Sequence, residues 1–359
     1  MLNVLPRQQG HKITIQEIAD LAGVSVATVS NVINHKHSKV SQRTIDKINQ
    51  LIKEYGFAPN LSARSLVTAK SGLLGILFYS PKQQIDFNDP FLSDVLTGIE
   101  SASKAQGKFI LVHGFSNVSD IQLIQQSWNF DGYVVIGAFE KIHNQINKLL
   151  QSPVVFIDTY LQEGTPVIDT KSVLPPRYYI YNNDRELSST ATELLIKNGH
   201  QKIAFFAPKI GMDEPGVVNE RYAGYLDALN AYQIQVEPSW FFDENSEREL
   251  IKRSQEYTAV LANSDYLAAK LNKAFREKEV TDKSLVGFDN SYLGSIITPR
   301  LTSVELEQKT KGQKAVEVLG VLDESKTSDQ LLETIIVPGY LLERDSVFNL
   351  KSRQSGGKQ

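Results

Sequence analysis

The chain has 359 residues, of which 41% are hydrophobic and 22% charged, so it is long enough for more than one globular domain of ordinary composition. The absence of cysteine excludes disulfides, thiol nucleophiles and cysteine metal sites, and no apolar run approaches the roughly 20 residues of a membrane span. The net charge of −3 is unevenly spread: residues 1–70 carry nine Lys/Arg and four Asp/Glu, a charge of +5, which leaves −8 for the rest. A basic head on an acidic body concentrates attraction for phosphate in the head.

The N-terminal segment contains no targeting signal. Residues 1–11 lack the apolar stretch of a signal peptide and lead almost directly into the basic head. We therefore expect a cytoplasmic protein with a short N-terminal extension.

Two short helices are predicted at the start of residues 12–59. Thr14 and Glu17 have the spacing of a capping box, and the apolar residues that follow recur with helical periodicity until Gly23. Ser25 is a good N-cap for a second helix that runs to about Ile33. This pattern predicts a helix-turn-helix.

The second helix has two contrasting faces. Val29, Val32 and Ile33 share the inward face, whereas Ala27 and Asn31 point the other way. Small apolar and amide side chains suit the major groove, where Asn pairs with adenine and apolar groups contact thymine methyls.

A third helix and a short linker complete the head. Ser41 caps the third helix and Gly56 ends it. Residues 60–66 (NLSARSL) leave room for two helical turns at most, and so short a helix is marginal by itself. The segment is therefore either a linker turn or a hinge helix that folds only on DNA and levers a base step open with Leu66.

The runs GVSVATVSNVIN and YGFAPNLSARSL resemble the DNA-binding domain and hinge of LacI/GalR-family transcriptional regulators, and the resemblance extends to about Ser346. It implies a homodimer that binds a pseudopalindromic operator in double-stranded DNA. It favours the hinge-helix interpretation, with Ala63 at the helix-packing position and Leu66 at the intercalating one. The predicted DNA-binding residues are Thr14, Ser25, Val26, Ala27, Thr28, Ser30, Asn31, Asn34, Asn60, Ala63, Arg64 and Leu66.

One recognition-helix position departs from the family pattern. Many relatives carry Arg where this chain has Asn31, and Arg usually reads guanine whereas Asn reads adenine. We therefore expect adenine preference at the corresponding operator position.

From Ser71 onward, near-continuous apolar runs alternate with amphipathic helical stretches. This alternation predicts βαβ units, parallel sheets covered on both faces and two doubly wound lobes. The predicted strands are 73–79, 108–114, 132–138, 153–158, 202–208, 257–263 and 284–289, and the helices between the first four are 91–107, 118–128 and 142–150.

The family resemblance implies that this body, residues 71–345, looks like a type I periplasmic sugar-binding protein with three crossovers between its lobes. The first lobe is predicted at about 71–199 and 301–325, and the second at about 200–300 and 326–345. A hinge and linker (60–70) precede the body and a tail (346–359) follows it. The tail has no apolar heptad, so we expect a dimer rather than a tetramer.

A ligand is expected in the cleft between the lobes, at the carboxyl ends of the strands. The resemblance matches Arg221, in RYAG, to an arginine that contacts effector hydroxyls or carboxylates, and Asp289, in GFDN, to another contact. From the residues alone, an arginine opening a helix is more simply a surface residue and an aspartate after a strand an N-cap. The predicted effector-binding residues are Tyr79, Phe91, Asn183, Arg221, Ser264 and Asp289, while Asp265 is a candidate helix cap.

A second departure concerns the first crossover. Where relatives usually carry Asp-Asn, this chain has Asn182-Asn183-Asp184, so which residue faces the cleft stays open.

No catalytic motif is present: the chain lacks a GxxxxGK[ST] loop, an HExxH motif, a GxSxG elbow and metal-spaced His/carboxylate pairs. We therefore expect no enzyme activity, cofactor or metal site. The predicted function is a repressor of carbohydrate-utilisation genes controlled by a sugar, with a phosphocarrier protein as a candidate co-regulator. The alternatives are a purine- or nucleoside-type corepressed repressor and a ligand-binding module with a vestigial DNA head.

Overall fold

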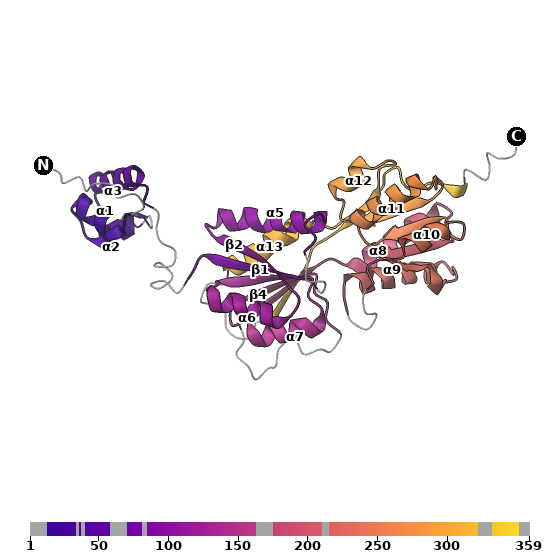
Figure 1. The fold of residues 1–359 in the computed structure, drawn as a ribbon, viewed down its shortest axis with the longest axis horizontal. Helices are drawn as coiled ribbons and strands as arrows, with labels where there is room; N and C mark the ends of the chain where they lie inside the picture. Colours follow the sequence, from indigo (N-terminus) through magenta and orange to yellow (C-terminus); the bar gives the residue numbers. More distant parts are fainter. Residues whose placement is uncertain are drawn as a thin grey trace. The chain divides into compact units, whose positions relative to one another are not determined.

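The computed structural model describes residues 13–33, 36, 40–57, 70–80, 85–162, 175–209, 215–321 and 332–351. The chain forms two compact units, a head up to Ser71 and a body from Gly72 (Figure 1). The predicted N-terminal extension and hinge helix lie outside the described residues. Within the described ranges, no helix has the length and apolar character needed to cross a membrane.

The head contains the three predicted helices, α1 (Ile15–Ala22), α2 (Val26–Ile33) and α3 (Gln42–Tyr55). The capping box of α1 is confirmed: the Thr14 N–H donates to the Glu17 carboxylate (2.7 Å), and the Glu17 N–H donates to the Thr14 hydroxyl (3.3 Å). The apolar stripes of all three helices form one core, which fixes the angle between α1 and α2.

The first lobe of the body is a six-stranded parallel sheet in the order β11-β5-β4-β3-β1-β2. One face packs against α5 and α13 and the other against α6 and α7, so the central strands are buried on both faces (Figure 1). The strands are β1 (Leu73–Tyr79), β2 (Phe109–Phe115), β3 (Gly132–Ile136), β4 (Val154–Ile157), β5 (Arg177–Tyr181) and β11 (Leu332–Ile336). The helices are α5 (Pro90–Ala105), α6 (Val118–Ser127), α7 (Glu140–Leu149) and α13 (Gln308–Val321).

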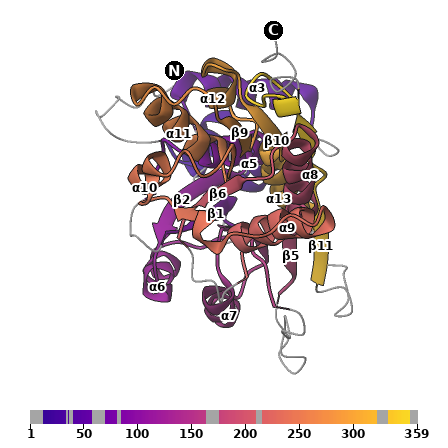
Figure 2. The same cartoon turned by 90° about the vertical axis from the view of Figure 1, so that its right-hand side faces the viewer.

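The second lobe repeats this plan in the order β12-β10-β9-β8-β6-β7, with only β12 antiparallel among its described pairings. Helices α8 and α9, side by side in Figure 2, cover one face, and α10 and α11 cover the other. The strands are β6 (Ile203–Ala207), β7 (Phe241–Asp243), β8 (Ala259–Ala262), β9 (Ser284–Phe288), β10 (Thr302–Glu305) and β12 (Tyr340–Leu342). The helices are α8 (Asp184–Lys197), α9 (Val217–Ala231), η2 (Pro238–Trp240), α10 (Glu247–Lys252), α11 (Asp265–Glu277) and α12 (Tyr292–Ile296).

The positions of the three crossovers differ from the predicted lobe boundaries at 199/200, 300/301 and 325/326. Strands β5, β10 and β11 place them near Asn182, Leu306 and Val337. Helix α8 belongs to the second lobe because its apolar face packs into that lobe's core, and β11 belongs to the first because it pairs with β5. At the first crossover the prediction failed because α8 was assigned to the lobe of the strand before it, and at the other two because β10 and β11 were assigned to the wrong lobe.

A single side chain joins the three crossovers. Asn182 is fully buried, and its Nδ2 donates to the carbonyl oxygens of Leu306 (3.1 Å) and Val337 (2.7 Å). Each of these three residues lies in a different crossover, so one amide group holds all three connecting segments together.

Candidate functional site

The recognition helix α2 presents the residues that the sequence assigns to DNA. Ala27 and Asn31 are exposed and Val26 and Ser30 are half-buried, while Val29 and Val32 pack inward. The outer face is therefore small and polar, as a helix that enters the major groove requires.

Three of the predicted DNA contacts also shape the head. Thr14 caps α1, and the Ser25 hydroxyl accepts the Thr28 N–H (3.2 Å) at the start of α2. Thr28 is half-buried and its hydroxyl lies 2.9 Å from that of Ser25. Asn34, Asn60, Ala63, Arg64 and Leu66 lie outside the described residues, so their roles stay predictions.

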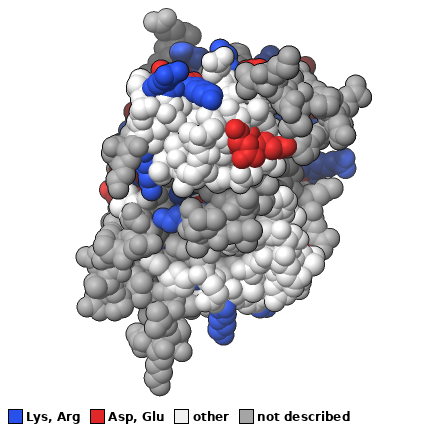
Figure 3. Space-filling view, turned by 90° about the vertical axis from the view of Figure 1, so that its left-hand side faces the viewer, with Lys and Arg blue, Asp and Glu red and all other residues white. Residues whose placement is uncertain are grey.

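The basic surplus of the head falls mainly outside its described core. Residues 13–33, 36 and 40–57 carry four Lys/Arg and four Asp/Glu. Figure 3 shows described Lys and Arg side chains at several separate places on one face of the protein. The remaining basic residues of the segment 1–70 lie in or next to the regions that flank these helices.

The body contains a cleft of about 960 Å³ lined by both lobes. Its walls are the segments that follow the carboxyl ends of the strands, where open α/β sheets bind ligands. From the first lobe come residues 85–89, Phe91, Gly137, Phe139 and Asp158, and α13 adds Gln308. The second lobe contributes Phe206, Pro208, 216–218, Arg221, Glu244, Asn245, Glu247, Asn263, Ser264, Tyr266, Leu267, Lys270 and Asp289.

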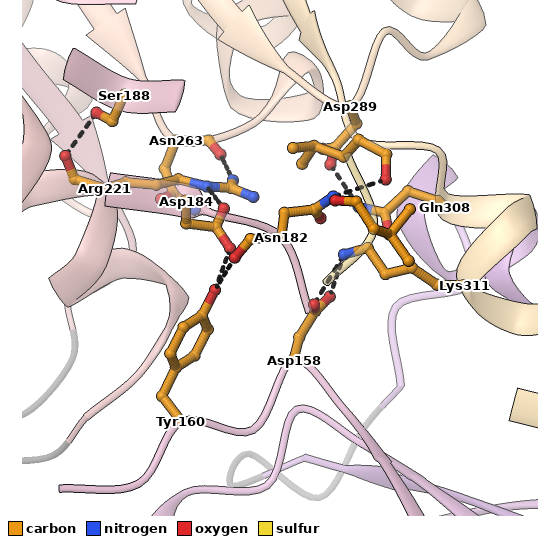
Figure 4. A network of polar contacts seen from close by, with 12 residues as sticks. Asp158, Tyr160, Asn182, Asp184, Ser188, Arg221, Asn263, Asp289, Gln308 and Lys311 are labelled. Atoms are coloured by element: carbon orange, nitrogen blue, oxygen red, sulfur yellow. Dashed lines mark hydrogen bonds and ion pairs between the residues drawn. The ribbon is translucent and has the colours of Figure 1, made fainter. Parts of the chain in front are cut away.

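Arg221 is held by an ion pair inside the cleft wall (Figure 4). Its Nε donates to Asp184 Oδ1 (2.7 Å), its Nη1 donates to the carbonyl oxygen of Asn263, and its guanidinium carbon lies 4.4 Å from the Phe288 ring centre. The Arg221 and Asp184 side chains are 6% and 0% exposed. Tyr160 donates to the other oxygen of Asp184 (2.5 Å). The positive charge of Arg221 is thus offset inside the protein before any ligand enters.

Gly224 explains the Arg-x-x-Gly spacing. A Cβ at Gly224 would lie 1.9 Å from the carbonyl oxygen of Arg185, so α8 and α9 approach this closely only because the residue is glycine. One turn earlier on α9, the same approach brings Arg221 against Asp184 at the start of α8.

Two further aspartates, each directly after a strand, have a left-handed backbone conformation. Asp158 follows β4 with φ of 53° and Asp289 follows β9 with φ of 99°. Both Asp158 oxygens accept from Lys311 Nζ (2.7 and 3.0 Å), whereas Asp289 Oδ1 accepts from the Gln308 amide (3.0 Å). Non-glycine residues in this region are strained, and such strain recurs at binding sites.

Asp289 therefore lacks the ion pair that Asp158 has. Burial raises the pKa of Asp289 to about 6, with Arg221 acting in the opposite direction. The Asp89 carboxylate, on the opposite lobe, raises it further.

Asp265 has a structural role behind the cleft. It is fully buried, its Oδ1 accepts from Ser303 (2.6 Å) and its Oδ2 from the Ser291 N–H (2.7 Å). The α11 N-cap is Ser264, whose hydroxyl accepts the Leu267 N–H (3.2 Å). The suggestion that Asp265 caps this helix is therefore wrong, since the preceding residue does so.

A hydrogen bond between the lobes bridges the mouth of the cleft. The Tyr266 hydroxyl of the second lobe donates to Asp86 Oδ2 of the first (3.0 Å), and Lys270 Nζ lies 3.9 Å from the Tyr266 ring centre. The half-buried Tyr266 and the exposed Asp86 thus connect the two rims.

Of the predicted effector-binding residues, the structure brings Phe91, Arg221, Ser264 and Asp289 together in the cleft. Tyr79 is not part of the cavity wall. Its ring contacts that of Phe139, which does line the cavity, with 5.6 Å between the ring centres.

Asn183 lies on the surface outside the cleft, beside Glu186. The run Asn182-Asn183-Asp184 thus has no residue in the cavity wall. Asn182 bonds the other crossovers, and Asp184 forms the ion pair with Arg221.

Sequence reasoning missed Asp158, Tyr160, Gln308 and Lys311. Asp158 was visible as the residue that ends an apolar strand run, the same signal that identified Asp289. The other three carry no local pattern, because their role arises from segments that meet only in the fold.

A helix-turn-helix head joined to a two-lobed α/β body with a central cleft defines a ligand-responsive DNA-binding regulator. Residues 14–60 match the family described as "Bacterial regulatory proteins, lacI family", and residues 192–347 match the "Periplasmic binding protein-like domain". The chain belongs to the lacI family of bacterial regulatory proteins.

Similar proteins match over nearly their whole length. The HTH-type transcriptional repressor PurR of Vibrio atlanticus (strain LGP32) is 28% identical over 94% of this chain and 99% of its own. The HTH-type transcriptional regulator MalR of Staphylococcus xylosus gives the same three values. The Lac repressor dimer bound to operator and the anti-inducer ONPF has a TM-score of 0.75 at 22% identity, covering 94% of this chain and 100% of that chain. A CelR–cellobiose complex has a TM-score of 0.65 at 22% identity, with 93% and 99% coverage.

Proposed function

We propose that this protein is a transcriptional repressor whose affinity for a pseudopalindromic operator is set by a sugar-like molecule bound in the cleft. DNA-binding regulation under small-molecule control is the function that the family defines. The observation that carries the proposal for this chain is the cleft itself, lined by strand ends of both lobes, in a protein whose recognition helix exposes Ala27 and Asn31.

The composition of the cleft supports a polyhydroxylated effector. Phe91 and Phe139 offer apolar ring faces, and Asp289 and Arg221 offer planar charged groups that bond adjacent hydroxyls. The CelR structure named above is a cellobiose complex, which agrees with a sugar in this fold. A carbohydrate-utilisation operon is the corresponding target.

Control of DNA binding requires that the effector bind two lobe arrangements with different affinities. A ligand that contacts both lobes meets this requirement, because its contacts change when the lobes rotate. In a homodimer this rotation alters the spacing of the two heads. We further propose a cytoplasmic homodimer without enzyme activity; a phosphocarrier co-regulator stays a prediction.

Operator recognition is tested by binding-site selection followed by fluorescence anisotropy on the selected duplex. We expect a pseudopalindrome bound with strong salt dependence, because phosphate contacts release counterions. Asn31→Ala should relax the preference for adenine at one position of each half-site and cost about 1–3 kcal/mol there. Unchanged base preference at every position would contradict the assignment of Asn31. A head that binds no selected sequence would favour the ligand-binding module with a vestigial DNA head.

Effector control is tested by thermal shift with sugars, nucleosides and purines, then by anisotropy with each compound that stabilises the protein. Phe91→Ala is the control variant, because replacing Arg221 would also break its buried ion pair with Asp184. A stabilising sugar that changes operator affinity supports the proposal. A purine or nucleoside that strengthens operator binding would instead favour the corepressed type of repressor.

A further inference from the structure

The charges that line the cleft are predominantly negative. Among its described lining residues are six carboxylates and two cations. One of the cations, Arg221, is offset by Asp184, and one of the carboxylates, Asp158, is offset by Lys311. Among the other described lining residues, Asp86, Asp89, Glu247 and Asp289 are carboxylates and Lys270, at the rim, is the one cation.

Two of these carboxylates come from opposite lobes. Asp89 is the N-cap of α5 in the first lobe, and Asp289 follows β9 in the second. Burial raises the pKa of Asp89 as it does that of Asp289, and the Asp89 charge acts on Asp289 across the cleft. Since like charges repel, the interaction between Asp89 and Asp289 opposes closure of the empty cleft, and the charges of Arg221 and Lys311 at Asp289 and of Lys270 at Asp89 offset it only in part.

Unpartnered acceptors in the same wall also call for donors. The side-chain oxygens of Asn263 and Gln308 have no hydrogen-bond partner among the described residues, although these two residues are only 9% and 3% exposed. Both residues line the cleft, and Gln308 already donates its amide nitrogen to Asp289. Buried amide oxygens are usually satisfied, so a donor-rich ligand completes this wall.

A metal ion does not fit these requirements. No group of three His, Asp or Glu side chains in the described part of the chain is arranged to hold one. An organic ammonium group needs fewer carboxylates and brings several N–H donors.

We propose that the cleft selects an effector with a protonated amine, such as an amino sugar, whose ammonium group lies between Asp89 and Asp289. This proposal rests on the effector site proposed above and names the chemical class it accepts. The ammonium group replaces repulsion between the lobes by attraction to both, so the effector itself favours closure. Phosphorylated sugars and sugar acids are excluded, because their negative charge meets further carboxylates while Arg221 is already paired.

The test compares matched pairs that differ in one amine, using thermal shift and calorimetry on the full chain at pH 7. The probes are glucosamine, galactosamine, mannosamine and ethanolamine, each against its hydroxyl counterpart, with the hexose 6-phosphates as anionic probes. We expect at least one amine to raise the melting temperature and to bind at least tenfold more tightly than its hydroxyl counterpart, and the phosphates to have no effect.

Variants separate the proposed contacts from general charge effects. Asp89→Asn keeps an N-cap for α5. We expect Asp89→Asn and Asp289→Asn, each made singly, to reduce the preference for the amine about tenfold. Glu277→Gln makes the same charge change on α11 outside the cleft, where its side chain is largely exposed, and should leave the preference unchanged. Loss of the preference in Glu277→Gln would overturn the assignment to Asp89 and Asp289.

The outcomes of these measurements distinguish this proposal from the proposed function. A neutral sugar or a sugar phosphate that binds as tightly as any amine and changes operator affinity would overturn amine selection but leave the repressor function standing. Amines that give no shift in any pair would also overturn amine selection. An amine that binds through Asp89 and Asp289 without changing operator affinity would support amine selection and contradict effector control.

Discussion

The ion pair between Arg221 and Asp184 is the most consequential interaction in the cleft wall, and Asp184→Asn tests it directly. This substitution keeps an acceptor for Tyr160 but removes the charge that Arg221 faces at 2.7 Å. Because the two side chains are 6% and 0% exposed, Arg221 would keep a buried charge without its hydrogen-bonded counter-ion, leaving only the more distant charges of Asp289 and Asp158. Breaking one partner of a buried pair costs about 3–5 kcal/mol.

The same two helices supply a matched control. Arg185 of α8 and Asp227 of α9 form a second Arg–Asp pair with an N–O distance of 2.6 Å, but their side chains are 58% and 45% exposed. Exposed pairs of this kind contribute about 0–1 kcal/mol. Asp227→Asn should therefore have little effect on the free energy of unfolding, although distance, residue types and helices are the same.

The assay is urea unfolding of the full chain followed by tryptophan fluorescence, with Trp240 as the reporter in the second lobe. A double variant, Asp184→Asn with Arg221→Gln, should recover part of the stability, because it leaves no buried charge uncompensated. If Asp184→Asn costs no more than Asp227→Asn, water in the cleft solvates Arg221 and the argument from burial is refuted.

Three further predictions follow from the body. Gly224→Ala should lower the free energy of unfolding by about 1–3 kcal/mol in the same urea assay, because its Cβ would meet the Arg185 carbonyl oxygen at 1.9 Å; an unchanged midpoint would show that α8 and α9 separate freely. Tyr266→Phe removes the bond to Asp86 across the cleft mouth, worth about 0.5–1.5 kcal/mol, and should raise the effector Kd about two- to tenfold by calorimetry; tighter binding would mean that this bond opposes closure. Burial raises the folded-state pKa of Asp289 to about 6 and that of Asp265 to about 8, above their unfolded values, whereas it lowers the pKa of His143 from 6.5 to about 4, which acts in the opposite direction at lower pH. Above the ordinary pKa of histidine the Asp265 contribution remains, so stability should fall as pH rises from about 6.5 to 8. Unfolding midpoints that rise across this range would contradict the assigned burial, and Asp265→Asn should flatten the upper part of the curve.

The sequence predicted the fold well where burial leaves a continuous signal. Strands such as β1 and β8 are buried on both faces and appear as unbroken apolar runs, so their positions agree with the prediction to within two residues at each end. Strand β10 gave no such run, because Thr302 and Ser303 are buried through hydrogen bonds rather than apolar contacts. Strands β11 and β12 are short and belong to different sheets, which only the three-dimensional fold reveals.

The site was predictable only in part for a related reason. Arg221 and Asp289 stand in short motifs that the family resemblance identifies, and both line the cleft. Their partners Asp184 and Gln308 lie 37 and 19 residues away along the chain, without any pattern that links them. The ion pair that offsets Arg221 therefore reverses the charge expected for the ligand, and no inspection of the arginine motif alone would show it.

The junction at Asn182 sets the kind of motion available to the body. Three separate peptide segments pass between the lobes, and one amide group bonds two of them from within the third. A sliding displacement would have to break both hydrogen bonds, whereas a rotation centred on the junction preserves them. The two lobes can therefore rotate about a single hinge at Asn182. Small displacements at the ligand become a change in the angle between the lobes, and this change is largest at the ends of the lobes far from the hinge.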